Sequence, residues 1–114
     1  MANVFKLVTK SGAATSAGTA QTIFTATTKT VLLGISVANL LGNTITMDIE
    51  MESTSAAPRN NANNVYIGKG IPVPSGASLN ALTGKIIMEA TDVLKITSTS
   101  DNSIDVALSL MEIN

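Results

Sequence analysis

The feature that most constrains the fold of this chain is a two-residue alternation of apolar and polar side chains. In residues 44–52 (TITMDIEME) every second side chain is Ile or Met, and those between are threonine or carboxylate. This period is typical of an antiparallel strand with one buried and one exposed face. No stretch of helical length carries a 3.6-residue apolar stripe, so the chain is predicted to be all-β.

The same period predicts further short strands along the chain. They fall at residues 2–9, 21–26, 31–38, 77–82, 86–90, 93–98 and 104–110. Residues 31–38 are apolar or small on both faces, so this strand is expected to lie centrally or beneath a partner. Residues 41–43 (LGN) are predicted to form a hairpin turn that joins it to the strand at 44–52. The alternation slips after Leu110, which predicts a bulge or a strand end at Leu110–Met111.

Many short strands separated by turns predict an antiparallel β-sandwich of the jelly-roll or immunoglobulin-like type, with about eight strands. The 114 residues fit a single domain, residues 1–114. Residues 1–10 are expected to form its first strand, or an arm that extends onto a neighbour. Pro72 and Pro74 cannot donate ladder hydrogen bonds, which places residues 71–74 at an edge or a rim.

Composition narrows the function. Hydrophobic residues make up 45% of the chain and charged residues 13%, with a net charge of -1, which argues against a disordered tail and a nucleic-acid-binding protein. The chain has no His and no Cys, so the usual acid–base residue and the usual zinc and haem ligands are missing. We therefore expect a protein that is not an enzyme and holds no metal or cofactor. The longest apolar stretch, residues 31–41, is shorter than the roughly 20 residues of a membrane-spanning helix.

Three carboxylates, Asp48, Glu50 and Glu52, share one face of the strand at residues 44–52. They are interpreted as a solvated face, or as partners of Lys from a neighbouring strand or subunit, and a hard-cation site is left open. Residues 101–105 pose a similar choice and are interpreted as starting with a plain β-turn. Residues 68–70 (GKG) resemble part of a phosphate loop, but the prolines that follow prevent the helix that such a loop needs.

Eight residues are the candidate interface positions, chosen for apolar, aromatic, cationic or rigid side chains on predicted strands and loops. They are Val4, Phe5, Leu32, Leu40, Arg59, Tyr66, Pro72 and Pro74. Arg and Tyr are enriched at the energetic centres of protein interfaces. A weakly charged chain with an apolar strand risks aggregation unless a symmetric assembly covers that strand.

Five phrases of the chain stand out beyond the strand pattern. They are residues 1–6 (MANVFK), 34–39 (GISVAN), 71–79 (IPVPSGASL), 88–98 (MEATDVLKITS) and 109–113 (SLMEI). Taken together they resemble small virion proteins of tailed bacteriophages, especially phages of cyanobacteria and other aquatic bacteria. The resemblance covers nearly the whole chain. It implies a structural role in the particle, without functional residues to carry over.

Three functions are expected. The first is a capsid decoration (cement) protein, a homo-oligomer with a trimer favoured, which stabilises the head shell by binding partners such as the major capsid protein. The second is a neck, tail or baseplate component with the same fold. The third is a carbohydrate- or host-surface-binding module, which the scarcity of aromatic residues disfavours. For the first two, the protein is located in the virion after assembly in the host bacterial cytoplasm, with no nucleic acid or membrane as its partner.

Overall fold

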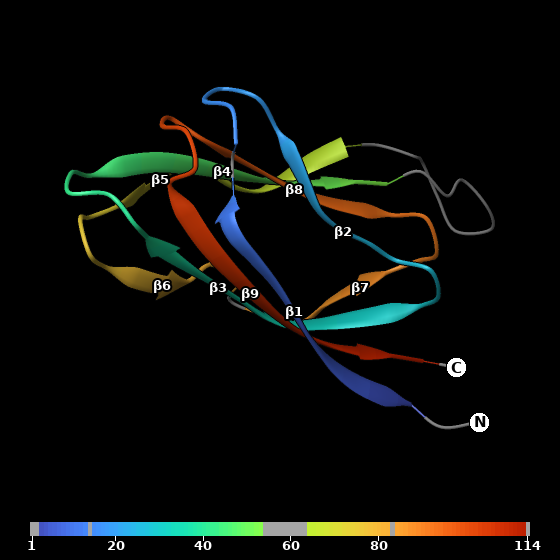
Figure 1. Cartoon of the computed structure of the whole chain (residues 1–114). Coiled ribbons are helices and arrows are strands. Elements are labelled where there is room, and N and C mark those ends of the chain that lie inside the picture. The colour runs from blue at the N-terminus through green and yellow to red at the C-terminus, as the bar shows by residue number, and fades with distance from the viewer. Residues whose placement is uncertain (1–2, 14, 54–63, 83, 114) are drawn as a thin grey trace.

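The computed structural model describes residues 3–13, 15–53, 64–82 and 84–113. Nine strands run through these residues (Figure 1): β1 (Val4–Ala13), β2 (Gln21–Thr25), β3 (Thr30–Asn39), β4 (Ile45–Glu52), β5 (Asn64–Val73), β6 (Ser78–Asn80), β7 (Ile86–Met88), β8 (Val93–Ser98) and β9 (Ile104–Glu112). Nowhere in these ranges is there a helix long and apolar enough to cross a membrane. The predicted all-β antiparallel sandwich is confirmed.

Two sheets pack on one another. Sheet A has the strand order β1, β9, β3, β6, with the short β7 paired to the other half of β3, and sheet B has the order β2, β8, β4, β5. The pairs are nested, because β1 meets β9, β2 meets β8, β3 meets β6 and β7, and β4 meets β5. This order results when one long hairpin is rolled into two sheets, so the sandwich is a jelly roll rather than an immunoglobulin-like domain.

The core fills the space between the sheets, and strand alternation supplies it. The Ile and Met side chains of β4 are buried, as their period predicted. The alternate apolar side chains of β9 are buried in the same core, and they are Ile104, Val106, Leu108 and Leu110. Each fully buried side chain of this size contributes about 1.5–3 kcal/mol, so these two strands are a main source of stability.

A bulge in β3 interrupts the alternation predicted for residues 31–38. Leu32 and Gly34 pair with consecutive residues of β9, so Leu33 between them has no partner there. The extra residue shifts the phase of the strand. Leu32 and Ile35 are therefore both fully buried although they lie three positions apart.

The irregularity predicted at Leu110–Met111 of β9 lies instead on β3, where the bulge at Leu33 stands next to Leu110. β9 itself pairs with β1 without a shift as far as Glu112. The slip in the sequence pattern arises because Glu112 takes an inward position, where its carboxylate lies 3.2 Å from Lys6 Nζ.

The predicted hairpin at residues 41–43 is wrong. β3 belongs to sheet A and β4 to sheet B, so the connecting chain crosses the sandwich, and the apolar faces of the two strands meet across the core. The buried Asn39 holds this crossing. Its Nδ2 donates to the carbonyl oxygens of Asn43 (2.8 Å), Val73 (2.9 Å) and Pro74 (3.2 Å).

The first strand stays on its own molecule. β1 pairs with β9 from Val4, opposite Glu112, to Lys10, opposite Val106. The arm predicted for residues 1–10 is therefore, over its described part, a strand of this chain's sheet A. The N-terminal end of β1 and the C-terminal end of β9 lie side by side and project from the body of the sandwich (Figure 1).

Candidate interaction surface

The outer face of sheet A, called face A below, is almost free of charge. Its side chains are those that alternate with the core residues of β1, β9, β3, β6 and β7. Among the described residues, Asp105 is the only ionisable side chain that the strand registers place on this face, and the ion pair of Lys29 and Glu89 lies at its margin, one residue beyond β3 and β7. The charge deficit seen in the sequence is therefore concentrated on one side of the molecule.

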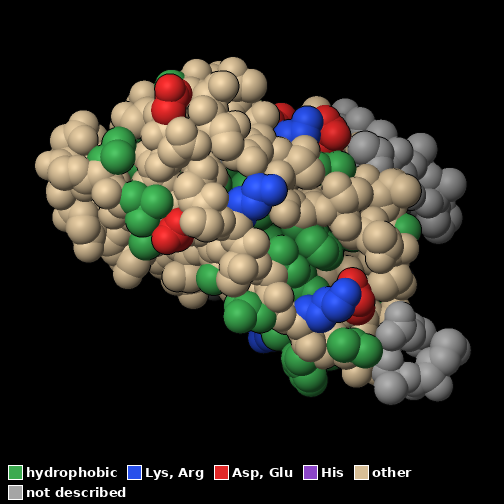
Figure 2. Space-filling view, in the orientation of Figure 1, with side chains coloured by type: hydrophobic (Ala, Val, Ile, Leu, Met, Phe, Trp, Pro, Cys, Tyr) green, Lys and Arg blue, Asp and Glu red, His purple; other side chains and the backbone are tan. Residues whose placement is uncertain are grey.

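One end of face A carries large apolar side chains. Phe5, Met111, Val31 and Ile87 stand directly opposite one another on four neighbouring strands and form one row across the sheet. Phe5 is 73% exposed and Ile87 61%, and Leu7 in the adjacent row is 70% exposed. Figure 2 shows hydrophobic side chains gathered low in the view, along and beneath β1. Contiguous apolar surface of this kind marks interaction sites in soluble proteins.

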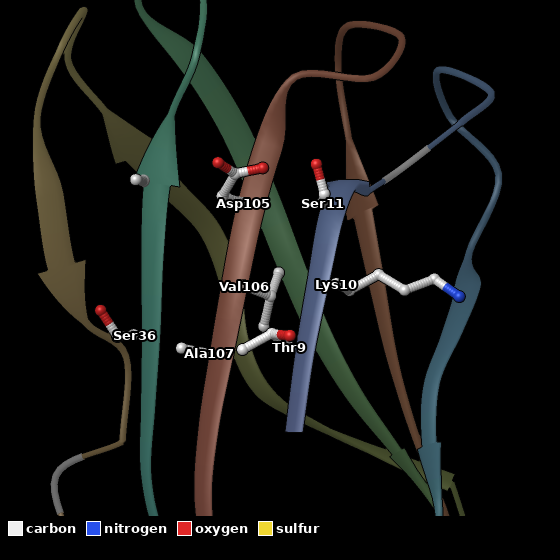
Figure 3. Close-up of a pocket in the computed structure, with 8 residues that line it drawn as sticks. Thr9, Lys10, Ser11, Ser36, Asp105, Val106 and Ala107 are labelled. Atoms are coloured by element: carbon white, nitrogen blue, oxygen red, sulfur yellow. The ribbon is translucent and has the colours of Figure 1, made fainter. Parts of the chain in front are cut away.

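The other end of face A is hollowed. Small side chains of β1, β9 and β3, among them Thr9, Ala107 and Ser36, line a recess of about 320 Å³ (Figure 3). The side chain of Lys10 points away from it toward β2. Asp105 lies at its end, where its Oδ1 accepts a hydrogen bond of 3.0 Å from the Gly12 amide. Face A thus combines a protruding end with a recessed end.

The edges of both sheets are guarded against pairing with another chain. β2, β6 and β7 are short, and β1 carries Lys6 and Lys10. β5 contains Pro72 and a register shift at residues 68–70, and the predicted edge position of residues 71–74 is confirmed. Short strands, lysines, prolines and bulges are the devices by which natural sheets avoid edge-to-edge association. Face A has no comparable protection.

The outer face of sheet B carries the charges that face A lacks. Asp48 Oδ2 lies 3.1 Å from Lys69 Nζ on β5, and Glu52 Oε2 lies 3.1 Å from Lys95 Nζ on β8. For Asp48 and Glu52, the interpretation of the β4 carboxylates as partners of Lys from a neighbouring strand is confirmed. Within the described ranges no group of three or more His, Cys, Asp and Glu could hold a metal ion.

The pKa of Asp48 is lowered chiefly by a hydrogen bond of 2.7 Å from the backbone amide of Gly70, with a smaller contribution from Lys69. Gly70 has a φ of +66°, which a glycine adopts easily and which the bulge in β5 requires. Residues 68–70, which resembled part of a phosphate loop, therefore bind a carboxylate of their own sheet. The pKa of Lys69 is raised by its hydrogen bond to Asp48. The Nζ of Lys69 also lies 4.5 Å from the ring centroid of Tyr66.

The acidic side chains within residues 101–105 accept hydrogen bonds from backbone amides. Asp101 Oδ1 accepts a hydrogen bond of 2.6 Å from the Ala17 amide, and Asn102 has a φ of +48°. Asn tolerates this left-handed conformation better than most residues. The interpretation of these residues as a turn is confirmed.

The predicted interface residues fall in different places. Val4 and Phe5 are exposed on β1, with Phe5 on face A and Val4 on the opposite side of the strand. Leu32 is fully buried, so its prediction as an interface residue is wrong, because the bulge at Leu33 turns it inward. Leu40 is half exposed and lies where the chain leaves β3.

Three of the remaining predicted positions belong to the side of sheet B. Tyr66 and Pro72 are exposed on the edge strand β5, and Pro74 is exposed just after it. Arg59 lies outside the described residues. The structure therefore does not bring the seven described positions together into one surface.

The residues that sequence reasoning missed are Leu7, Met111 and Ile87. Leu7 could have been found, because it lies two residues after Phe5 and alternation puts both on one face. Met111 and Ile87 could not, because only the strand register places them beside Phe5 and Val31.

No family model, curated protein or solved structure matches this chain. A jelly roll hosts several unrelated functions, so the fold alone does not assign one. The function is therefore argued from the contrast between the charged outer face of sheet B and the nearly uncharged face A.

Proposed function

We propose that this chain is a non-enzymatic structural protein of a tailed-phage particle, and in the first place a capsid decoration protein that assembles through face A. The observation that carries the proposal is the exposure of Phe5, Leu7 and Ile87 on a face with one carboxylate. Monomers in solution rarely expose such surface, whereas subunits of assemblies bury it.

The guarded edges support the same conclusion. A chain that avoided all contacts would protect its faces as well as its edges. Here the devices that prevent open-ended strand pairing are present on β1 and β5, while the face is left apolar. This combination suits a subunit with a limited number of defined contacts.

The assignment to a phage particle rests on the resemblance of the five sequence phrases to virion proteins. Jelly rolls also occur among viral capsid domains, which agrees with the assignment by analogy only. A neck, tail or baseplate subunit would use the same fold and the same kind of surface. The two locations differ in the number of copies per particle.

The test is quantitative mass spectrometry of particles purified from cells that make this chain, with the major capsid protein as the internal standard. A decoration protein is expected at hundreds of copies per particle. A count of about six or twelve would assign it to a symmetric ring at the neck or tail instead. Particles without the chain would contradict the structural proposal altogether.

A matched pair of variants links the count to face A. Ile87→Lys adds a charge to the apolar end, and Thr46→Lys adds the same charge to an exposed position on sheet B. We expect particles to lose at least about tenfold of the Ile87→Lys protein while keeping Thr46→Lys, because a buried unpaired ammonium opposes assembly. Equal incorporation of both would show that face A is not used.

A further inference from the structure

We propose that the occupant of face A is a second copy of this chain, in a two-fold dimer whose axis crosses the strands at the row of Leu7, Ser109 and Gly34. These three residues stand opposite one another on β1, β9 and β3, midway between the protruding and the recessed ends. The inference rests on the proposed function, because it names the partner in the assembly.

Shape is the first argument for a second copy. A two-fold axis in the plane of contact, perpendicular to the strands, lays each strand on its own counterpart with reversed direction. The row of Phe5 and Ile87 then faces the partner's row of Thr9, Ala107 and Ser36. The protruding side chains of each copy meet the recess of about 320 Å³ in the other. Face A contains both halves of its own complement.

Charge is the second argument. The same rotation carries Asp105 beyond the partner's Phe5 row, to the end where the backbone of Lys29 accepts a hydrogen bond from Ile113. Lys29 is exposed there, lies one strand away from the position that Asp105 reaches, and has its Nζ 3.8 Å from Glu89 Oε2 of its own chain. Asp105 therefore reaches the rim beside the ion pair of Lys29 and Glu89, and no charge is buried at the centre of the contact.

Area is the third argument. Four strands about 4.8 Å apart, over about nine residues of 3.3 Å each, give a face of roughly 550 Å². Two copies bury about 1,100 Å², which just exceeds the roughly 1,000 Å² of a specific interface. The value lies at the low end for specific interfaces, below the roughly 1,200–2,000 Å² of stable ones.

A two-fold pair formed through face A also leaves the sheet edges unused, which agrees with their protection against strand pairing. A ring such as the expected trimer uses two different patches on each subunit, one complementary to the other. The apolar and the recessed ends of face A lie on one continuous surface, which a partner in face-to-face contact covers at once. Strand pairing at an edge would instead leave Phe5, Leu7 and Ile87 exposed.

The first test is sedimentation velocity of the purified chain over a range of concentrations from about 1 to 100 μM. We expect the mass of two copies at the upper end, and monomer for Leu7→Lys throughout, with its dissociation constant raised at least about 100-fold by two ammonium groups at the axis. Thr46→Lys, on sheet B, should dimerise as the unchanged chain does. A wild-type monomer at 100 μM, or a mass of three copies, would overturn the proposal.

The second test does not depend on the lysine variant. The chain has no cysteine, so Leu7→Cys and Thr46→Cys each introduce a unique thiol. Facing sheets pack about 10 Å apart, which suits a short bis-maleimide. We expect Leu7→Cys to form a cross-linked pair at the axis and Thr46→Cys to remain single. Efficient cross-linking of Thr46→Cys alone would place the contact on sheet B and overturn the proposal.

The two proposals fail separately. A chain that is present in particles but monomeric in both tests keeps its structural function and loses the dimer. A chain that dimerises through Leu7 but is missing from particles keeps the dimer and loses the proposed function.

Discussion

At the scale of single residues, Asp48 shows how the sequence pattern of three carboxylates becomes a stabilising contact. Its two carboxylate oxygens are divided between the Gly70 amide and Lys69 Nζ, both supplied by the bulge of β5. The amide bond is the larger cause of the lowered pKa of Asp48. Because the carboxylate is bound more strongly in the folded chain than in the unfolded chain, protonation must weaken the fold.

We expect this contribution to be present above pH 4 and to be lost as the pH falls through the lowered pKa of Asp48. The free energy of unfolding of Asp48→Asn should therefore be lower than that of the unchanged chain at pH 6. The difference between the two free energies should shrink toward pH 2.5. Urea unfolding at a series of pH values measures it. Lys69→Met is the matched control, because it removes the ion pair and keeps the amide bond. If Lys69→Met abolishes the pH dependence as fully as Asp48→Asn, the assignment to Gly70 is wrong.

At the scale of elements, the bulge in β3 decides which side chains reach the core. Leu33 has no partner on β9, so its deletion should leave a regular ladder with Leu32 and Ile35 still inside. We expect a folded protein with a melting temperature lower by about 5–10 °C, for the loss of one partly buried side chain. Circular dichroism on heating measures this.

Ser36 is the matched deletion, because it lies in the regular part of the same strand. Removing it shifts every later residue of β3 to the wrong face, and Val37 would leave the core. We expect this variant not to fold. A Ser36 deletion as stable as the Leu33 deletion would mean that the bulge does not set the register.

The bulge also marks the limit of what the sequence predicts about the elements. The alternation in β4 places its core face correctly, since no irregularity interrupts residues 45–52 on that strand. In β3 both faces are apolar, so the pattern cannot say where the phase slips, and Leu32 was predicted on the wrong side. The pattern also cannot show that the short turn-like segment after Asn39 crosses between the sheets. The crossing depends on hydrogen bonds from Asn39 to the carbonyl oxygens of Val73 and Pro74, which lie far along the chain.

The candidate surface was predictable only in part for the same reason. Phe5 was found from the sequence because it is aromatic and lies near the start of an alternating strand. Its neighbours Met111 and Ile87 come from segments far along the chain, and pairing through β9 and β3 brings them together. A surface built from four strands is a property of register, which a local pattern does not contain.

At the scale of the whole molecule, the nested pairing joins the two ends of the chain. Val4 stands opposite Glu112, so β1 and β9 form the outermost of the nested pairs, with β1 at the edge of sheet A. The closure of so long a loop is costly in entropy and slows the folding of sheets of this kind. A circular permutant in which Asn114 is joined to Met1 would turn β9 and β1 into a local hairpin.

The permutant is best opened between Gly84 and Lys85, which are both exposed between β6 and β7. Exposed loops of this kind tolerate new termini. We expect a free energy of unfolding within about 2 kcal/mol of the unchanged chain, because one long closure is exchanged for others. The folding rate in stopped-flow urea experiments should rise at least about tenfold, since the separation of β1 and β9 falls from nearly the whole chain to one turn.

A second permutant with about 20 Gly and Ser residues at the new junction should fold more slowly than the first. If both permutants fold at the rate of the unchanged chain, pairing of β1 with β9 follows the rate-limiting step, and the two ends of the chain are joined late in folding.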